Sequence, residues 1–437
     1  MQKNSFYIET YGCTSNKADS HIITNVLEKV NYTRTSLNDA QFVIINTCAV
    51  KEQTENKIKA RLEYLYENFQ KEPNRYIIIA GCLPYIAPNY IEVIKNIIPS
   101  FAAIIDLNNL LDLPEIFQEI KSGNRNLIFK SNKSIDKSKY HIDHPTGKIT
   151  GIIPISEGCL GSCTYCCVKN ARGKLHCYEP KEIVKNVRHQ IKQGIKQIYL
   201  TSQDCSTYMY NGITLSDIVS NIVNLNFKFY LRIGMINPSF LLNNTDQLIS
   251  IFKQPKVYHF LHIPIQSGSN KILQQMQRKY YISDIISNID VLRNKFKNLT
   301  ISTDIICGFP SETEYDFYRT INFIKWLKPE ILNISKFTPR PGTYAKKMEQ
   351  LDSKIIKKRS KRLSKVFRAS LRDMNKKWLN WKGEVLILHE GIAANQAFSR
   401  NYAYKNIFIE DYKGKYGEFL YVKVYKVDGF NLYGKIN

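Results

Sequence analysis

The sequence of 437 residues lacks any long apolar run, and it holds few cysteines for its length. No window approaches 18 uninterrupted apolar residues, and the amino terminus leads directly into a strand-like run. These absences argue against a membrane-spanning helix and a signal peptide. Ten cysteines are few for a disulfide scaffold of this size. We therefore expect a cytoplasmic protein without a membrane partner, whose cysteines serve metal or redox chemistry.

Acidic residues are scarce beside basic ones. Lys and Arg number 62 against 38 Asp and Glu, which gives a formal net charge of +24. Such an excess predicts an extended anionic partner such as nucleic acid. A biased genome composition is the alternative explanation, because Lys, Ile, Asn and Tyr are all abundant. With 43% hydrophobic residues and no low-complexity tract, the chain is expected to pack into roughly two to four domains.

Strand-like and helix-like segments alternate from the amino terminus, and a cysteine follows each of the first three predicted strands. The strands lie at residues 5–9, 42–45 and 76–79. The cysteines that follow them are Cys13, Cys48 and Cys82. Because the carboxyl ends of parallel strands meet at one edge of a sheet, these thiols can converge on one crevice. The alternative is that they are small apolar residues that close the sheet. We predict an open parallel α/β sheet domain over residues 1–120.

The rest of the chain is predicted to hold a linker, a barrel, a basic helix and a second, smaller barrel. Residues 121–147 are rich in Ser, Lys and Asn without periodicity, which is typical of linkers. Six strand–helix units over residues 148–350 favour a partial (β/α)6 barrel, with its active edge at the carboxyl ends of the strands. A Lys- and Arg-rich helix over 351–377 precedes short strands of period two at 378–437, which predict a small antiparallel β-barrel. The fold class is α/β.

The strongest chemical signal is a C-x3-C-x2-C run directly after a predicted strand, made by Cys159, Cys163 and Cys166. Three thiolates spaced so closely can cap one face of a [4Fe-4S] cube and leave one iron open to another ligand. A structural zinc site is the alternative, although zinc sites favour C-x2-C pairs. Cys167 leaves a second set open, since Cys159, Cys163 and Cys167 also form a candidate trio. We favour Cys166 because the aromatic Tyr165 precedes it.

This loop, with Tyr165 before its last cysteine, resembles the radical S-adenosylmethionine (SAM) superfamily. Motifs at other strand ends resemble one branch of it, the methylthiotransferases. They include Tyr11-Gly12-Cys13, Asn46-Thr47-Cys48, Ala80-Gly81-Cys82, Ala171-Arg172-Gly173, His262-Ile263-Pro264-Ile265-Gln266-Ser267-Gly268-Ser269, Thr303-Asp304-Ile305-Ile306-Cys307-Gly308-Phe309-Pro310 and Pro339-Arg340-Pro341-Gly342-Thr343. The resemblance spans nearly the whole chain. It implies an N-terminal methylthiotransferase domain, a radical SAM core and a C-terminal TRAM domain that binds RNA.

Within that family the sequence is most similar to the archaeal and eukaryotic branch that modifies N6-threonylcarbamoyladenosine at position 37 of tRNA. The likeness lies in Lys169-Asn170-Ala171-Arg172-Gly173, Phe260-Leu261-His262-Ile263-Pro264 and Lys347-Met348-Glu349-Gln350. It implies a transferase that inserts a methylthio group at C2 of that base, with two [4Fe-4S] clusters and SAM as cofactors. By this resemblance Cys159, Cys163 and Cys166 hold the cluster that cleaves SAM. Cys13, Cys48 and Cys82 hold the auxiliary cluster that carries the sulfur.

SAM is expected across the carboxyl edge of the central barrel, where polar residues end the strands. The candidate contacts are Gln203, Asp204, Arg232, Gln266 and Ser267. Ordinary hydrogen bonding at the barrel end is the alternative for each of them. We also expect Ser311 to cap the following helix, with Glu314 completing a capping box.

The tRNA anticodon loop is expected to contact the basic helix and the C-terminal barrel through Lys and Arg, together with a minority of exposed aromatic side chains. The aromatic candidates are Tyr402, Tyr404, Phe408, Tyr412 and Tyr421. We expect a monomer that takes electrons from a donor the sequence does not identify. The cysteines outside the two trios are expected to serve packing; they are Cys167, Cys177, Cys205 and Cys307.

Two kinds of alternative function remain open at this point. The same chemistry can act on isopentenyladenosine-37 of tRNA or on an aspartate of a ribosomal protein. The other alternative is a non-catalytic RNA-binding protein whose iron-sulfur clusters are structural and fully ligated by protein.

Overall fold

The computed structural model describes residues 3–69, 72–131 and 133–437, and the chain divides into two compact units. The first unit comprises Met1–Asp143, Pro154–Glu179 and Thr338–Lys346. The second comprises His144–Ile153, Pro180–Phe337 and Lys347–Asn437. The six candidate cluster cysteines all belong to the first unit, whereas the candidate SAM contacts belong to the second.

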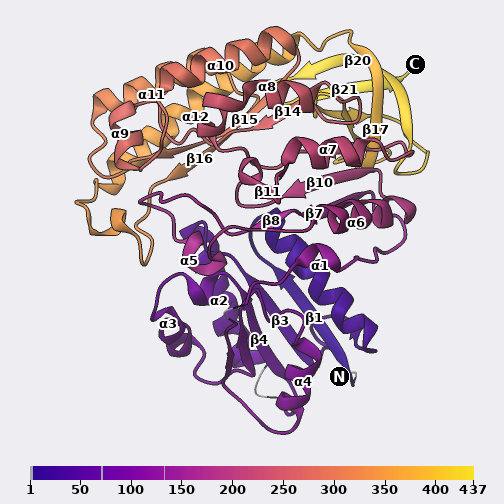
Figure 1. Ribbon diagram of the computed structural model, residues 1–437, viewed down its shortest axis with the longest axis vertical. Helices are drawn as coiled ribbons and strands as arrows, with labels where there is room; N and C mark the ends of the chain where they lie inside the picture. The colour runs from indigo at the N-terminus through magenta and orange to yellow at the C-terminus, as the bar shows by residue number, and fades with distance from the viewer. Residues whose placement is uncertain (1–2, 70–71, 132) are drawn as a thin grey trace. The chain divides into compact units, whose positions relative to one another are not determined.

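A six-stranded parallel sheet in the order β2-β1-β3-β4-β5-β6 forms the centre of the first unit (Figure 1). Its strands are β1 (Ser5–Thr10), β2 (Thr33–Arg34), β3 (Phe42–Thr47), β4 (Tyr76–Gly81), β5 (Ala103–Ile105) and β6 (Leu127–Phe129). The central strands β3 and β4 are runs of apolar residues buried on both faces, as parallel sheets require. The segment 121–147, predicted as a linker, contributes β6 to the edge of this sheet.

Helices cover both faces of the sheet, and the alternation of side chains along each strand supplies both cores. Phe42 and Ile44 face one core, and Val43 and Ile45 face the other. The helices of the first core are α1 (Thr14–Lys29) and α4 (Leu113–Lys121), and those of the second are α2 (Glu52–Asn68) and α3 (Tyr90–Ile97). The first unit also contains the antiparallel pair β8 (Ser156–Glu157) and β9 (His176–Cys177) and the short α5 (Val168–Arg172).

Six strands of the second unit form a curved sheet. They are β7 (Thr150–Pro154), β10 (Gln197–Thr201), β13 (Tyr230–Arg232), β14 (Phe260–His262), β15 (Thr300–Cys307) and β16 (Ile331–Lys336). Two three-stranded sheets, β13-β10-β7 and β14-β15-β16, are joined by parallel bridges from Leu231 to Val257 and from Met235 to His262. The sheet ends at β7 and β16, which matches the predicted partial barrel.

Helices connect these strands. They are α6 (Pro180–Lys192), α7 (Leu215–Val223), α8 (Leu241–Phe252), α9 (Asn270–Gln275), α10 (Ile282–Lys295) and α11 (Glu314–Leu327). A small hairpin of β11 (Met209–Tyr210) and β12 (Ile213–Thr214) precedes α7. None of the helices in the described ranges is both long and apolar enough to cross a bilayer.

The second unit ends in α12 (Ser353–Lys376) and a closed barrel in the order β17-β18-β19-β21-β20. The barrel strands are β17 (Lys382–Glu390), β18 (Ala397–Asn401), β19 (Asn406–Ile409), β20 (Phe419–Asp428) and β21 (Asn431–Ile436). The predicted small barrel is confirmed, with one parallel pair, β19 with β21, among antiparallel ones. Leu386 and Leu388 of this barrel pack against Tyr230, Tyr258 and Phe260 of the curved sheet.

The capping prediction for α11 was wrong. Thr313 caps the helix, and its hydroxyl accepts a hydrogen bond from the amide of Asp316, whose carboxylate accepts one from the amide of Thr313. Ser311 instead adopts a left-handed backbone conformation, with φ of 64°, and its hydroxyl donates to Gln275. The turn after β15 is therefore longer than the sequence pattern indicated, which moves the capping box from Glu314 to Asp316.

Candidate metal centres

Cys13, Cys48 and Cys82, here called the sheet trio, lie at the carboxyl edge of the sheet in the first unit. Cys13 follows β1 and directly precedes α1, whereas Cys48 follows β3 and Cys82 follows β4. The strand order reverses between β1 and β3, and ligands of open α/β sheets bind at such a switch point. Cys48 and Cys82 are buried and Cys13 is exposed, so one thiol of the trio stays accessible.

Gly12 and Asn16 determine the space around the sheet trio. Gly12 has φ of +112°, and a Cβ added to it would lie 2.6 Å from the Cys48 sulfur. The Cys13 thiol donates to Asn16 Oδ1 over 3.3 Å, while the Asn16 amide donates to the carbonyl of Thr47 over 2.7 Å. The absence of a side chain at Gly12 therefore leaves room beside the Cys48 sulfur, and Asn16 ties α1 to the end of β3. These features fit a bulky group held by the sheet trio.

Burial sets the acidity of these thiols. Desolvation raises the pKa of Cys82 to about 12 and also raises the pKa of Cys48. The positive charge of Arg172 acts in the opposite direction on both. Metal ligands are thiolates, so these buried sulfurs need a nearby cationic group when they are charged. An iron-sulfur cluster and the Arg172 guanidinium are both suited to that task.

Cys159, Cys163 and Cys166, here called the loop trio, lie between β8 and α5 and are half-buried. The amide of Gly161 donates to the Cys159 sulfur over 3.2 Å. A Cβ added to Gly161 would lie 3.2 Å from the Cys159 sulfur and 3.8 Å from the Cys163 sulfur. Two sulfurs of the loop thus share one small space that a side chain would fill. Burial raises the pKa of Cys166 to about 12.

The cysteine trios could hold either a single zinc ion or an iron-sulfur cluster. Within the described ranges, no three or more His, Cys, Asp or Glu side chains are placed to bind one ion together. A structural zinc site gathers four ligands around one ion. A [4Fe-4S] cube differs, because each thiolate binds a different iron and the ligands stand farther apart.

Cys167 has the environment of a packing residue. It is 2% exposed, and its thiol donates to the carbonyl of Ala49 over 3.3 Å within the core that also contains Cys48 and Cys82. Arg340 donates to the same carbonyl over 2.9 Å and forms a 2.6 Å ion pair with Glu55. This environment favours Cys166 as the third ligand of the loop trio.

Sequence reasoning missed a buried ionic network that joins the segments carrying the two trios. Arg172 binds Asp19 over 2.8 Å and Glu157 over 2.6 Å. Lys137 binds the second oxygen of each of these carboxylates, over 2.8 Å in both cases. Lys137 lies in the segment predicted as a linker, and no sequence pattern there indicated that its side chain would be buried. The available signal was the motif Ala171-Arg172-Gly173, which begins five residues after Cys166.

Two of the predicted SAM contacts are engaged within the second unit. Asp204 is 2% exposed and accepts hydrogen bonds from the amides of Ser206 and Asn237, and burial raises its pKa. Ser267 is fully buried, and its hydroxyl pairs with that of Thr320 over 3.4 Å. Both residues hold loops at the carboxyl ends of strands.

The other three candidates, Gln203, Arg232 and Gln266, are half-buried in the second unit. Gln203 and Gln266 are half-buried, and Gln266 has a left-handed backbone with φ of 72° at a strand end. The Arg232 guanidinium lies 4.8 Å from the ring centres of Tyr199 and Phe260, and its Nε is buried with no hydrogen-bond partner among the described residues. An unsatisfied guanidinium donor fits an anionic group of a ligand, such as the carboxylate of SAM.

A hydrogen-bonded histidine and aspartate on the same sheet were also missed. His262 Nε2 lies 2.9 Å from Asp304 Oδ2, and both side chains are partly exposed. His262 pairs in register with Ser302, so His262 and Asp304 share one face of the sheet. The structure thus pairs this histidine with a carboxylate.

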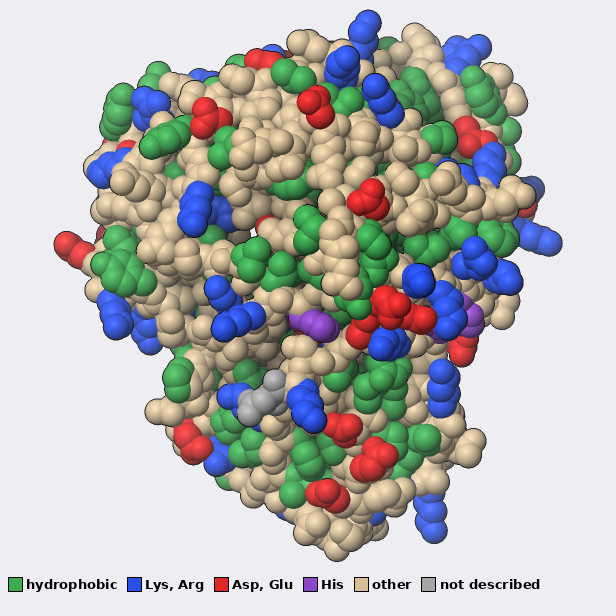
Figure 2. Space-filling view, in the orientation of Figure 1, with side chains coloured by type: hydrophobic (Ala, Val, Ile, Leu, Met, Phe, Trp, Pro, Cys, Tyr) green, Lys and Arg blue, Asp and Glu red, His purple; other side chains and the backbone are tan. Residues whose placement is uncertain are grey.

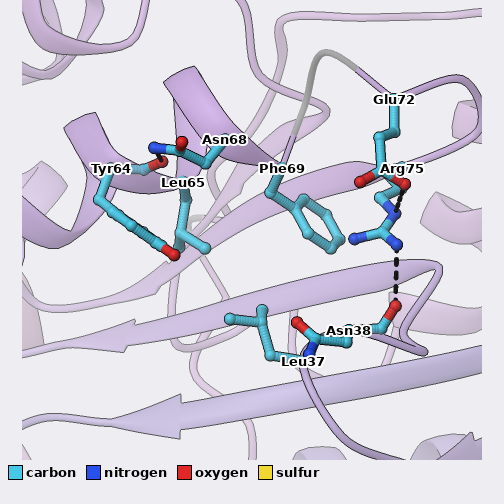
Figure 3. A pocket seen from close by; sticks show the side chains of 8 residues that line it. All are labelled: Leu37, Asn38, Tyr64, Leu65, Asn68, Phe69, Glu72 and Arg75. Atoms are coloured by element: carbon cyan, nitrogen blue, oxygen red, sulfur yellow. Dashed lines mark hydrogen bonds and ion pairs between the residues drawn. The ribbon is translucent and has the colours of Figure 1, made fainter.

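The pocket drawn in Figure 3 lies at the opposite edge of the first unit's sheet from the sheet trio. Its lining comes from the end of α2, the segment before β4 and the segment before β3: Leu37, Asn38, Tyr64, Leu65, Asn68, Phe69, Glu72 and Arg75. Figure 3 shows Arg75 bound to Glu72 and to the carbonyl of Asn38, each over 2.8 Å. The only cationic side chain of the lining is therefore already engaged.

Comparison with known proteins identifies the family. The family model described as the radical SAM superfamily matches residues 153–324, and the one described as uncharacterized protein family UPF0004 matches residues 5–104. A Pyrococcus horikoshii protein named "probable threonylcarbamoyladenosine tRNA methylthiotransferase" is 35% identical over 435 residues, which cover 98% of this chain and 99% of that protein. The chain belongs to the threonylcarbamoyladenosine tRNA methylthiotransferase family.

Further relatives agree with this assignment, which confirms the resemblance read from the motifs. The human threonylcarbamoyladenosine tRNA methylthiotransferase is 32% identical, and the match covers 96% of this chain and 72% of the human protein. Among solved structures, the radical SAM methyltransferase TsrM from Kitasatospora setae matches with a TM-score of 0.55 at 12% identity, over 76% of this chain and 74% of that one. The likeness to TsrM shows a shared fold. Members of the threonylcarbamoyladenosine tRNA methylthiotransferase family are transferases.

Proposed function

We propose that the chain inserts a methylthio group at C2 of N6-threonylcarbamoyladenosine-37 in tRNA. The observation that carries the proposal is the presence of two separate cysteine trios within the first unit, one at the ends of parallel strands and one on a single loop. The names of the relatives favour threonylcarbamoyladenosine over isopentenyladenosine or a ribosomal protein aspartate as the acceptor.

Each trio would hold one [4Fe-4S] cluster. We assign the SAM-cleaving cluster to the loop trio, because three closely spaced thiolates leave one iron open to SAM. The sheet trio would hold the auxiliary cluster. When bound, these groups supply the one-electron and sulfur chemistry that an adenine C2–H needs, since it is neither acidic nor electrophilic.

The chain's own residues prepare both sites. In the loop trio, the Gly161 amide stabilises negative charge on the Cys159 sulfur. In the sheet trio, the burial of Cys48 and Cys82 keeps water from two of the three sulfurs, while Asn16 fixes the position of Cys13. The protein thereby fixes the position of the cofactor ligands and excludes water from them, while the cofactor supplies the chemistry.

For SAM we propose contacts from Gln203, Arg232 and Gln266. The unpartnered Nε of Arg232 supports this set, because a buried donor without an acceptor is unfavourable until a ligand supplies one. Asp204 and Ser267 are engaged in internal hydrogen bonds, so we assign them to positioning the strand ends.

For tRNA we propose that the anticodon loop binds the second unit at α12 and the C-terminal barrel. Exposed basic side chains of α12 include Lys354, Lys357, Lys358, Lys361 and Lys365. Tyr421 is 56% exposed and free to stack on a base, whereas Phe408 and Tyr412 are buried within the barrel. Figure 2 shows Lys and Arg side chains spread over the visible face, which suits attraction of a polyanion. We further expect a cytoplasmic monomer supplied with electrons by a separate donor.

The test combines anaerobically loaded protein, dithionite, SAM and tRNA that carries threonylcarbamoyladenosine. We expect release of 5'-deoxyadenosine, and mass spectrometry of the digested tRNA should show the methylthio product. Loaded protein that releases no 5'-deoxyadenosine would support the non-catalytic alternative. A product only on isopentenyladenosine, or only on a ribosomal protein, would reassign the acceptor.

A further inference from the structure

Arg172, six residues after the last cysteine of the loop trio, occupies an unusual position. Its side chain is 3% exposed and extends from α5 to α1, the helix that begins after Cys13. One guanidinium nitrogen donates to Asp19 over 2.8 Å and to Asn16 Oδ1 over 3.1 Å. The Cys13 thiol is bonded to the same Asn16 oxygen, so a single amide separates the guanidinium from the first sulfur of the sheet trio.

The guanidinium of Arg172 lies close to the sheet trio. It donates to the same Asn16 oxygen as the Cys13 thiol, and the side chains of Arg172 and of its partner Asp19 are each 3% exposed. Coulomb interactions are strong here because the low-polarity interior screens them weakly. Arg172 is thus a fixed positive charge beside the sheet trio, although it belongs to the segment that carries the loop trio.

We propose that Arg172 sets the reduction potential of the cluster held by the sheet trio. This inference rests on the proposed function, because it requires a cluster at Cys13, Cys48 and Cys82. On reduction one electron passes from the reductant to the cluster, and no bond to protein forms or breaks. The reduced cluster carries one more negative charge, so a buried cation nearby stabilises it more than the oxidised one.

Asp19 supplies an opposing charge at the same place. Its carboxylate is 3% exposed and partly neutralises the guanidinium that it binds. Removing that carboxylate should leave the sheet trio in a more positive surrounding and raise the reduction potential. Removing the guanidinium should lower it. A purely structural role of the ion pair predicts no such opposition, because either substitution breaks the same contact.

The experiment uses the full chain in a Cys159→Ala, Cys163→Ala, Cys166→Ala background, so that one cluster remains. Redox titration followed by electron paramagnetic resonance gives its midpoint potential. For Arg172→Gln we expect at least a tenfold weaker reduction equilibrium, which is a shift of about 59 mV to more negative potential for a one-electron couple. Arg172→Lys keeps the charge and should shift the potential less. Asp19→Asn should shift it in the positive direction.

The matched control is Arg75→Gln, an arginine of the same unit at the opposite edge of the sheet, which should leave the potential unchanged. Shifts of the same sign in Arg172→Gln and Asp19→Asn, or no shift in either with the cluster loaded, would overturn the inference. If Arg172→Gln fails to fold, a positive shift in Asp19→Asn beside a smaller shift in Arg172→Lys still supports it. An iron content near zero in the background variant would overturn the sheet-trio assignment itself, and this inference with it.

Discussion

The sheet trio and the loop trio each consist of three cysteines, but these come from the chain in different ways. The loop trio comes from one short stretch, where spacing and the small Gly161 bring sulfurs together locally. The sheet trio comes from three strands far apart in sequence, and only the parallel sheet brings their ends to one edge. The first site therefore depends on a local turn, and the second depends on the packing of a whole sheet. Substitutions in one trio should therefore change that site and leave the other site intact.

Removing either trio is expected to have the largest effect. Two clusters contain about eight irons, so replacing one whole trio by Ala should lower the iron content to about four per chain. The loop-trio variant should also lose 5'-deoxyadenosine release, whereas the sheet-trio variant should keep it and make no methylthio product. Iron analysis and product chromatography measure both. Loss of SAM cleavage in the sheet-trio variant alone would reverse the two roles.

Substitutions of Gly12 and Gly161 should have the next largest effect, because each glycine lies beside a sulfur of one trio. Gly12→Ala places a Cβ 2.6 Å from the Cys48 sulfur and strains a backbone with φ of +112°, so the sheet trio should fail to load and about half the iron should be lost. Gly161→Ala brings a Cβ only to 3.2 Å of a sulfur and should reduce loading of the loop trio less severely. Gly123→Ala is the control, since Gly123 has φ of +105° with no atom within 4 Å. Equal iron loss in Gly12→Ala and Gly123→Ala would assign the effect to backbone strain.

The ion pair between Arg340 and Glu55 should support both trios alike. It is buried beside Ala49 and Cys167, which are the chain neighbours of Cys48 and Cys166. Arg340→Met leaves Glu55 with Lys59 and Tyr90 as its remaining partners and should lower the free energy of unfolding of the first unit by about 1–3 kcal/mol. Urea denaturation followed by circular dichroism measures the change. The double variant Arg340→Met, Glu55→Gln should recover part of the loss, and a double variant as unstable as the single one would contradict a charge-based cause.

Cys167→Ala should give the smallest effect. It removes one buried thiol and its hydrogen bond to Ala49, which is worth about 1 kcal/mol of stability. Iron content and 5'-deoxyadenosine release should stay near those of the unmodified chain. If Cys167→Ala loses the SAM-cleaving cluster while Cys166→Ala keeps it, Cys167 is the third ligand of the loop trio.

Much of the fold was predictable because its elements are locally specified. Buried apolar runs such as Phe42–Thr47 and Tyr76–Gly81 mark parallel strands, and strand ends then locate Cys48 and Cys82. The C-x3-C-x2-C spacing likewise needs no tertiary information. The closed C-terminal barrel followed from its period-two strands.

The rest could not be predicted because it depends on partners distant in sequence. Nothing around Lys137 distinguishes it from a solvated lysine, and its carboxylate partner Asp19 lies 118 residues away. At strand ends, a polar residue that binds a ligand resembles one that caps a loop. Asp204 and Ser267 proved to be engaged in loop hydrogen bonds, while the half-buried Gln266 remains at the strand end.

The packing of the segment Pro154–Glu179 within the first unit limits how the protein can be divided. A fragment that starts at residue 148 would follow the sequence boundary of the central barrel, yet it would lack Asp19 and Ala49. Arg172 would then lose a buried counter-ion and Cys167 its hydrogen-bond acceptor. Truncation at that apparent boundary should therefore yield a barrel whose loop trio is disordered, so both sequence families have to be expressed on one chain for this loop to fold.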